Sequence, residues 1–302
     1  MKVLILHTLP PGQVDAGRWE WEFDLQTSTD GIRAVLPDAV AEGVRGEASE
    51  IIDAVNRAGA DVVFNLCEAP LGKPSLEPHA AALFEWLGVP FTGSGSEALA
   101  LCRRKDLTKQ VLRGAGVPVP GSDVFPCIVK PAGEDGSAGI YTDSVCLNPA
   151  EVARAMARLG APALVEQFLP GREFAVSLWG KLDPEYVSVG ETVFEGGVRL
   201  LTYEGKWDTE SYDYLNTPLL YHGAVEEALY ARVVEVAKGA WRATGLRGYA
   251  RIDVRLDSEG SPCVLDVNPN PALNPGVGVY RAAEEAGWTW ERFVSQQLEW
   301  AL

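Results

Sequence analysis

The chain begins with a short run of apolar residues, and similar runs return through its first hundred positions. Positions 3–6 and 61–66 are mostly apolar and have the length of strands, whereas 28–36 and 49–58 have the spacing of amphipathic helices. Short strands that alternate with helices are typical of βαβ units, in which helices cover a parallel sheet. The first third of the chain is therefore predicted to be an α/β unit.

Turn-rich segments divide the rest of the chain. A helix predicted over 79–87 ends at Gly88 and is followed by a segment, 90–95, that is rich in Pro, Gly and Ser. From about Phe174 strand patterns dominate until a long helix over 225–244, whose apolar face carries Val225, Leu229, Val233, Ala237 and Trp241. The sequence predicts an α/β protein, α+β in its C-terminal half, with three domains over 1–95, 96–172 and 173–302.

A glycine-rich segment follows the predicted strand over 127–130. Lys130 ends this strand, and four of the next residues up to 139 are Gly133, Gly136, Ser137 and Gly139. Glycines let backbone N–H groups converge on an anion, and the lysine adds a positive charge. The lysine precedes the glycines, and 139–142 has the pattern of a strand rather than a helix, so this is not a GxxxxGK[ST] phosphate loop. An anion-binding loop and a plain hairpin turn both fit.

Two alternating strands near the C-terminus predict an antiparallel hairpin. If Glu259 and Gly260 form a two-residue loop, Asp253 lies opposite Asp266 and Arg251 lies opposite Asn268, with all four side chains on one face. A three-residue loop would shift this pairing by one residue. Opposed Cβ atoms are about 5 Å apart, so the two carboxylates need a cation between them. Oxygen ligands from two acids and an amide suit Mg²⁺ held jointly with substrate phosphates. A solvated sheet face is the alternative, and it predicts scattered Thr and Lys instead.

The charge and composition of the chain exclude several classes of partner. Its 42 acidic and 26 basic residues give a formal net charge of −16, which argues against nucleic acid and against an anionic membrane surface. The five cysteines form no CxxC pair, which indicates reduced thiols and a cytoplasmic protein. The first apolar run is too short for a signal peptide or a membrane span.

Several motifs occur in one order along the chain. They are 105–109 ahead of 116–120, then 128–131 with its glycine loop, 165–169 with 171–174, 251–254 and 265–268. In this order they resemble the ATP-grasp superfamily, in its D-alanine-D-alanine ligase branch, from about residue 60 to the C-terminus. The resemblance implies an ATP-grasp fold of three domains that holds Mg-ATP between the central and C-terminal domains. It also implies transfer of the γ-phosphate to a carboxylate, followed by displacement of the acylphosphate by an amine.

The resemblance assigns nucleotide contacts to matching residues. Lys105 and Lys130 match the lysines that contact the ATP phosphates, and Glu173 matches the carboxylate that holds the ribose hydroxyls. The hinge strand that reads adenine is matched by Glu166, Gln167, Phe168 and Leu169. The lid over the phosphates is matched by Gly136, Ser137 and Gly139.

The resemblance also assigns metal ligands and catalytic residues. Asp253, Asp266 and Asn268 match the ligands of Mg²⁺, for which Mn²⁺ is a possible substitute, and Asp266 replaces the more usual Glu. Arg251 matches the arginine that stabilises the tetrahedral intermediate and the transferred phosphoryl group. Lys206, on the loop that closes over the γ-phosphate, and Ser137 of the lid complete the implied catalytic set.

The candidate substrate contacts depart from the family pattern. Glu22, Glu68 and Ser75 are the candidates in the N-terminal third, with Glu22 the candidate contact to a substrate ammonium. Val277 and Gly278 stand near the Ser-Leu pair that holds the second substrate's carboxylate in D-alanine-D-alanine ligases. Losing that hydroxyl removes a hydrogen bond of about 1.5–3 kcal/mol, so another acyl donor or amine is expected.

The sequence therefore predicts an Mg-ATP-dependent carboxylate-amine ligase that acts on an amino acid or another small carboxylate. A genuine D-alanine-D-alanine ligase, a kinase that stops after phosphoryl transfer, and a nucleotide-binding sensor without catalysis remain alternatives. Retention of Arg251 with both acids argues against the sensor, since binding alone does not need the arginine. The expected partners are small carboxylates and amines in a cytoplasmic homodimer, without nucleic acid or membrane.

Overall fold

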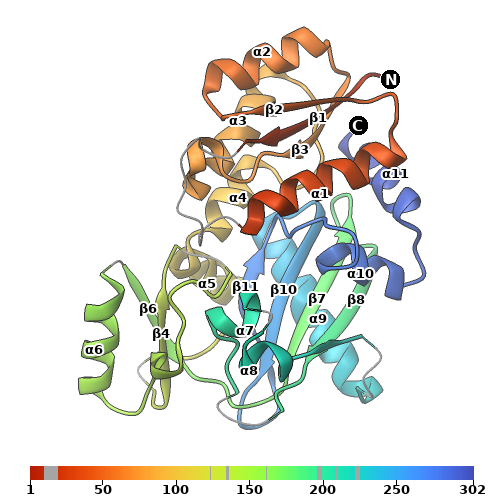
Figure 1. The fold of residues 1–302 in the computed structure, drawn as a ribbon. Coiled ribbons are helices and arrows are strands. Elements are labelled where there is room, and N and C mark those ends of the chain that lie inside the picture. The colour runs from red at the N-terminus through yellow and green to blue at the C-terminus, as the bar shows by residue number, and fades with distance from the viewer. Residues whose placement is uncertain are drawn as a thin grey trace.

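The computed structural model of the chain describes residues 1–9, 20–122, 124–133, 136–160, 162–195, 199–208, 210–221 and 225–302, without the side chains of 20–24 and of Trp207. Three separate sheets organise it: one at the top of Figure 1, a small one at the lower left and a larger one at the lower right. This is the α/β architecture with an α+β C-terminal half that the sequence predicts.

The N-terminal sheet is parallel, with the order β2-β1-β3. Its strands are β1 (Val3–Thr8), β2 (Val40–Val44) and β3 (Val62–Leu66). All of β1 is buried because helices cover both faces of the sheet. On one face lie α1 (Glu20–Val35) and α11 (Trp290–Ala301), and on the other α2 (Ala48–Ala58) and α3 (Glu77–Leu87). Helix α10 (Gly278–Glu285) packs against α11 and the largest sheet instead. The last helix of the chain thus completes the core of its N-terminal sheet.

The small sheet and its helix form the layer at the lower left of Figure 1. Its antiparallel strands, in the order β5-β4-β6, are β4 (Cys127–Pro131), β5 (Val145–Cys146) and β6 (Ala163–Gln167). Helix α6 (Pro149–Leu159) packs on one face.

The strand predicted over 139–142 is wrong, and the reason is the local backbone. Ser137 and Gly139 have φ angles of 61° and 74°, so the segment turns instead of extending, and a 3₁₀ turn, η3 (Thr142–Ser144), follows. A Cβ atom on Gly139 would lie 2.7 Å from Cγ of Pro131, so the turn also needs glycine for its close approach to β4.

The largest sheet is antiparallel, with the order β11-β10-β7-β8-β9. Its strands are β7 (Glu173–Gly180), β8 (Tyr186–Thr192), β9 (Leu219–Leu220), β10 (Gly248–Leu256) and β11 (Pro262–Asn268). Helix α9 (Glu227–Thr244) covers one face with the predicted stripe, of which Val233, Ala237 and Trp241 are buried. The remaining elements are α4 (Ser96–Cys102), α5 (Lys105–Gly114), α7 (Tyr203–Trp207), α8 (Tyr212–Leu215), η1 (Pro70–Gly72) and η2 (Pro74–Leu76).

The turn between β10 and β11 differs from the predicted one. The backbone N–H of Asp257 donates to the carbonyl of Ser261 at 2.9 Å, which leaves three residues in the loop instead of two. The side chain of Asp257 also accepts from the backbone N–H groups of Glu259 and Ser261, and this Asx-type bonding favours the longer turn.

The extra loop residue does not disturb the pairing farther along the hairpin. A β-bulge at Leu265 takes up one residue of β11, because Val254 pairs with Val264 whereas Asp253 pairs with Asp266. The two predicted pairs are therefore confirmed: Asp253 with Asp266, and Arg251 with Asn268.

Two further expectations concern cysteines and membranes. All five cysteines are free and buried. Within the described ranges, no helix has both the length and the apolar composition needed to cross a bilayer.

The core between α9 and the large sheet yields a stability prediction. Trp241 is fully buried and donates its indole N–H to the carbonyl of Leu182 at 3.1 Å, whereas Trp86 on α3 is 90% exposed. Trp241→Ala is expected to lower the free energy of unfolding by about 3–5 kcal/mol, measured by urea denaturation. The matched Trp86→Ala change is expected to stay within about 0.5 kcal/mol, and equal losses from both variants would contradict this assignment of the core.

Candidate active site

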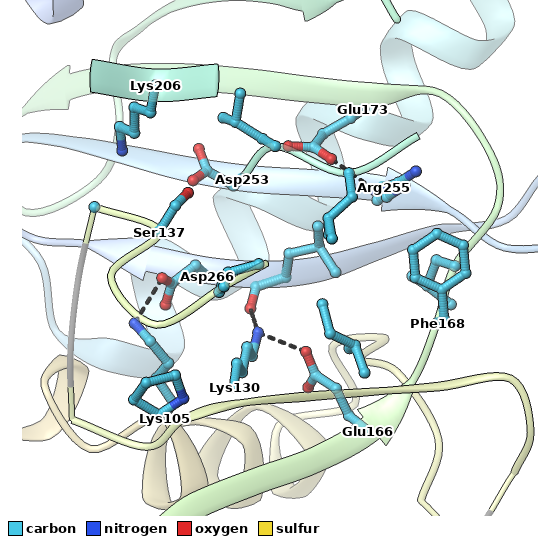
Figure 2. A pocket seen from close by; sticks show the side chains of 18 of the residues that line it. Lys105, Lys130, Ser137, Glu166, Phe168, Glu173, Lys206, Asp253, Arg255 and Asp266 are labelled. Atoms are coloured by element: carbon cyan, nitrogen blue, oxygen red, sulfur yellow. Dashed lines mark hydrogen bonds and ion pairs between the residues drawn. The ribbon is translucent and has the colours of Figure 1, made fainter. Parts of the chain in front are cut away.

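A pocket of about 850 Å³, including its open mouth, lies between the small sheet and the large sheet. The hinge segment that leads from β6 to β7 forms one end, and the turn 136–140 and α7 border it from the other side. Lys105, the first residue of α5, and the facing strands β10 and β11 supply most of its charged groups. Figure 2 shows these side chains converging from elements that are far apart in the sequence.

The pocket brings together most of the residues that the sequence singles out. Those that line it are Lys105, Lys130, Gly136, Ser137, Glu166, Gln167, Phe168, Leu169, Glu173, Lys206, Arg251, Asp253 and Asp266. Its apolar walls come from Ile128, Ala138, Ile140, Leu200, Leu201 and Leu265. Such a mixture of apolar walls and a few convergent charged groups is typical of small-molecule sites.

The remaining predicted residues lie elsewhere. The side chain of Glu22, on α1, is outside the described residues. Gly139 belongs to the turn beside β4, and Ser75 lies in η2. Val277 and Gly278 are the N-cap and first residue of α10. Glu68 follows β3, and Asn268 ends β11. None of these lines the pocket as described, so their proposed substrate or metal contacts remain predictions.

Asn268 lies beside a polar cluster that connects the large sheet to the N-terminal unit. Its side-chain oxygen accepts from the backbone N–H of Asn270 at 3.0 Å. Asn270 in turn donates to Glu77 at 2.6 Å and accepts from the Tyr249 hydroxyl at 2.9 Å. Because Glu77 begins α3, these bonds tie the segment after β11 to the N-terminal unit.

One edge of the pocket carries two carboxylates, each paired with a cation. Lys105 donates to Asp266 at 2.7 Å, and Arg251 makes a bidentate contact with Asp253 at 2.7 and 3.0 Å. Burial alone would raise the pKa of Asp266, but Lys105 and Lys130 outweigh it and lower the pKa. Asp253 raises the pKa of Arg251, which therefore stays cationic. Each of the two acids therefore lies beside a cation of its own.

Glu166 occupies a buried charge cluster beneath the pocket. Its carboxylate lies 2.6 Å from the ammonium of Lys130 and 3.3 Å from that of Lys109, and all three side chains are nearly inaccessible. Burial would raise the pKa of Glu166, yet the two lysines lower it overall. The sequence assigns Glu166 to adenine contacts, and the structure shows that its carboxylate also holds Lys130 in place.

Lys109 is a member of this cluster that the sequence analysis leaves without a role. Lys109 donates to the carbonyl of Val264 at 2.7 Å, and Lys130 donates to that of Leu265 at 3.4 Å. The β-bulge thus directs two successive carbonyl groups at the two lysines. The four-residue spacing from Lys105 on one amphipathic helix was the signal that could have identified Lys109.

Arg255 also lines the pocket and was missed by the sequence analysis. It is 3% exposed and forms an ion pair with Glu173 at 3.0 Å. Burial raises the pKa of Glu173, and Arg255 opposes that effect. The alternation along β10 could have identified it, since residues two apart share a face and Arg251 and Asp253 are already on the pocket side.

The charge of the pocket bears on the ligands it can hold. Its cations are Lys105, Lys130, Lys206, Arg251 and Arg255, and its carboxylates are Glu166, Glu173, Asp253 and Asp266, which leaves an excess of one positive charge. A triphosphate needs more compensation than this, and a divalent cation would supply it. Asp253 and Asp266 fit that ion, because they are opposed hard oxygen donors with side chains 25% and 30% exposed.

The protein itself would supply few of the ligands of such an ion. In the described part of the chain there is no group of three or more His, Cys, Asp or Glu placed to bind a metal. Two carboxylates with substrate oxygens completing the coordination match the way proteins bind Mg²⁺ with phosphates, rather than a closed all-protein site.

Several known proteins resemble this chain in sequence. A family model described as D-ala D-ala ligase C-terminus matches residues 109–299. The D-alanine-D-alanine ligase of Parvibaculum lavamentivorans is 30% identical over 83% of this chain and 83% of its own length. That of Stutzerimonas stutzeri is 34% identical over 76% and 75%. The uncharacterised protein y4sG of Sinorhizobium fredii is 31% identical over 79% and 74%.

Two crystal structures of D-alanine-D-alanine ligase from Bacillus anthracis share the fold. They superpose with TM-scores of 0.77 and, for the complex with ATP, 0.75, at 16% identity. The match covers 100% of this chain and 97% of each of theirs. At this identity the likeness establishes the ATP-grasp fold.

The buried cluster yields a pH prediction. Burial lowers the pKa of Lys109 to about 8, although Glu166 opposes the shift. A lysine with a lowered pKa in the folded state binds fewer protons there than when unfolded, so its destabilising effect is full below about pH 8 and fades towards about pH 10.4. The free energy of unfolding of the wild type relative to Lys109→Met is expected to rise across this window, by at most about 1.4 kcal/mol per pH unit.

Chemical denaturation at a series of pH values measures this difference. Lys181→Met, which removes an exposed lysine, is the matched control for the loss of one positive charge. A difference between the wild type and Lys109→Met that does not change with pH would show that Lys109 is not buried beside Glu166.

Proposed function

The chain belongs to the D-alanine-D-alanine ligase family of the ATP-grasp superfamily, and on that basis we propose that it is an ATP-dependent, ADP-forming ligase joining a small carboxylate to an amine. The observation that carries the proposal is the convergence of Arg251, Asp253 and Asp266 with two lysines in one pocket between the small and large sheets. Phosphoryl transfer needs such charge neutralisation and alignment more than a covalent catalyst.

Each charged group has a defined part in this proposal. Lys105 and Lys130 would bind phosphate oxygens, since both ammonium groups are fixed by carboxylates at 2.7 and 2.6 Å and reach the pocket. Asp253 and Asp266 would hold Mg²⁺ or Mn²⁺, which when bound neutralises and orients the phosphates. Arg251 would stabilise the acylphosphate and the negative oxygen that forms when the amine attacks it.

The substrates distinguish two versions of the proposal. The names of the relatives favour D-alanine as both donor and acceptor. The segment after β11 favours a different amino acid or small carboxylate, because exposed Val277 caps α10 where a hydroxyl would otherwise contact the acceptor. We favour the second version. A sensor without catalysis does not explain an arginine placed beside both acids.

The test is product formation from ATP across an array of D- and L-amino acids and small acids, singly and in pairs. We expect ADP and phosphate, with full turnover only when a carboxylate and an amine are both present. D-Alanine as the sole compound needed would identify the genuine D-alanine-D-alanine ligase. Formation of AMP and pyrophosphate would refute the mechanism, and phosphate transfer without amide formation would identify a kinase.

Arg251 provides a variant test of the same proposal. Arg251→Lys keeps a positive charge but loses the bidentate fork, so kcat is expected to fall by about 10²–10³ while the Kd for ATP changes by less than about threefold. Arg232→Met, on α9, removes an arginine whose hydrogen bonds within the described residues go to the turn at Gly260 and Ser261, and wild-type turnover is expected. Unchanged kcat in Arg251→Lys would remove Arg251 from the proposed mechanism.

A further inference from the structure

Arg255 is a buried arginine in the wall of the pocket, and its position follows from strand pairing. It lies opposite Glu173 in the antiparallel pair of β10 and β7, with Nη1 3.0 Å from Oε2 of the glutamate. Both side chains line the pocket, as Figure 2 shows, and the exposed fractions of the two side chains are only 3% and 12%. A buried ion pair of this kind is costly unless its remaining groups are also bonded.

The other nitrogen atoms of the guanidinium are bonded as well. Nε donates to the carbonyl of Gly171 at 3.2 Å, and Nη2 donates to the carbonyl of Arg199. The guanidinium carbon lies 5.1 Å from the ring centroid of Phe168 and 5.3 Å from that of Phe194. Arg255 is therefore fixed by the hinge segment after β6, by β7 and by the segment at 199, three parts of the chain that meet at the pocket.

This arrangement leaves one side of the Glu173 carboxylate for a ligand. Oε2 accepts from Arg255, while among the described residues no hydrogen bond to Oε1 is found. An ionised carboxylate only accepts hydrogen bonds, and Arg255 already compensates its charge, so a neutral group with hydrogen-bond donors suits the remaining oxygen. Two adjacent hydroxyls provide such donors. Because the three bonds of the guanidinium come from a rigid planar fork, they fix the direction of the carboxylate as well as its charge.

We propose that Arg255 is a positioning residue for nucleotide specificity: it holds Glu173 so that the pocket selects ribonucleoside over deoxyribonucleoside triphosphates. The inference rests on the proposed function in taking this pocket as the nucleotide site. Arg255 does not touch the sugar in this account. It acts through Glu173, which accepts hydrogen bonds from the vicinal hydroxyls of the ribose.

Equilibrium binding of ATP, 2′-deoxyATP and 3′-deoxyATP, without carboxylate or amine substrates, tests the inference. We expect the wild type to bind each deoxynucleotide at least about tenfold more weakly than ATP, as for a lost hydrogen bond to a charged group. In Arg255→Met the ratio is expected to fall to within about twofold. In Arg255→Lys, which keeps the charge without the planar fork and is the better-tolerated change, the ratio is expected to be about threefold. Glu173→Gln is expected to lose the preference for ATP over the deoxynucleotides to the same extent as Arg255→Met. The double variant is expected to show the same ratio as either single variant.

Arg172→Met is the matched control. Arg172 precedes Glu173 and makes a bidentate ion pair with Glu191 at 2.7 Å, away from the pocket, so the wild-type preference for ATP should persist. Thermal unfolding verifies that each variant is folded, and if Arg255→Met is not, Arg255→Lys decides. A variant that binds all three nucleotides more weakly but keeps the wild-type ratio would reduce Arg255 to a structural role and overturn the inference. Equal binding of the three nucleotides by the wild type would overturn it too.

The two proposals fail in different ways. Preferential binding of ATP that is lost in the Arg255 variants, combined with no ADP formation from any carboxylate and amine, would support the inference and overturn the proposed ligase. Ligase turnover with ATP and 2′-deoxyATP at equal KM would support the proposed ligase and overturn the inference about Arg255. Absence of any nucleotide binding by the wild type would overturn both.

Discussion

The site depends on the alternation of side chains along β10, the strand that pairs with both β7 and β11. Ala250, Ile252 and Val254 are fully buried in the core beneath the sheet, so Arg251, Asp253 and Arg255 must emerge on the opposite face, into the pocket. A shift of one residue would place three charges in an apolar core and three apolar side chains in the pocket. The hydrophobic core therefore fixes the register, and the register fixes the chemistry.

Charge compensation explains how an acidic protein holds a concentrated set of cations. The whole chain has a net charge of −16, yet the cations lining the pocket outnumber its carboxylates by one. Lys130 and Lys109 remain buried because they share Glu166 and reach the two carbonyl groups at the bulge of β11. Since a buried charge without partners is strongly unfavourable, the acid and the bulge carbonyls are as necessary to the site as the lysines. The positive charge available to a ligand is what remains after this internal pairing.

The spacing of apolar residues predicted several buried strands and the long helix, but it missed an edge strand, the last two helices and one turn. Strands β1, β3 and β4 and helix α9 have clear apolar patterns, and their positions were predicted to within a few residues. Strand β2 was missed because it is an edge strand with half-exposed positions that include Glu42 and Gly43, and α10 and α11 were not predicted. The extended pattern at 139–142 failed because the backbone of Ser137 and Gly139 is left-handed.

The sequence by itself indicated the pairing of Asp253 with Asp266 and the family, because strand alternation and the order of motifs can both be read along the chain. Only the tertiary structure decided how the pairing survives a longer turn, through a bulge at Leu265. It also decided that Lys109 joins Glu166 and that Arg255 holds Glu173, since these contacts link positions 57 and 82 residues apart. Such partners are set by the packing of whole elements against one another, and no local pattern of residues encodes which buried charges will meet.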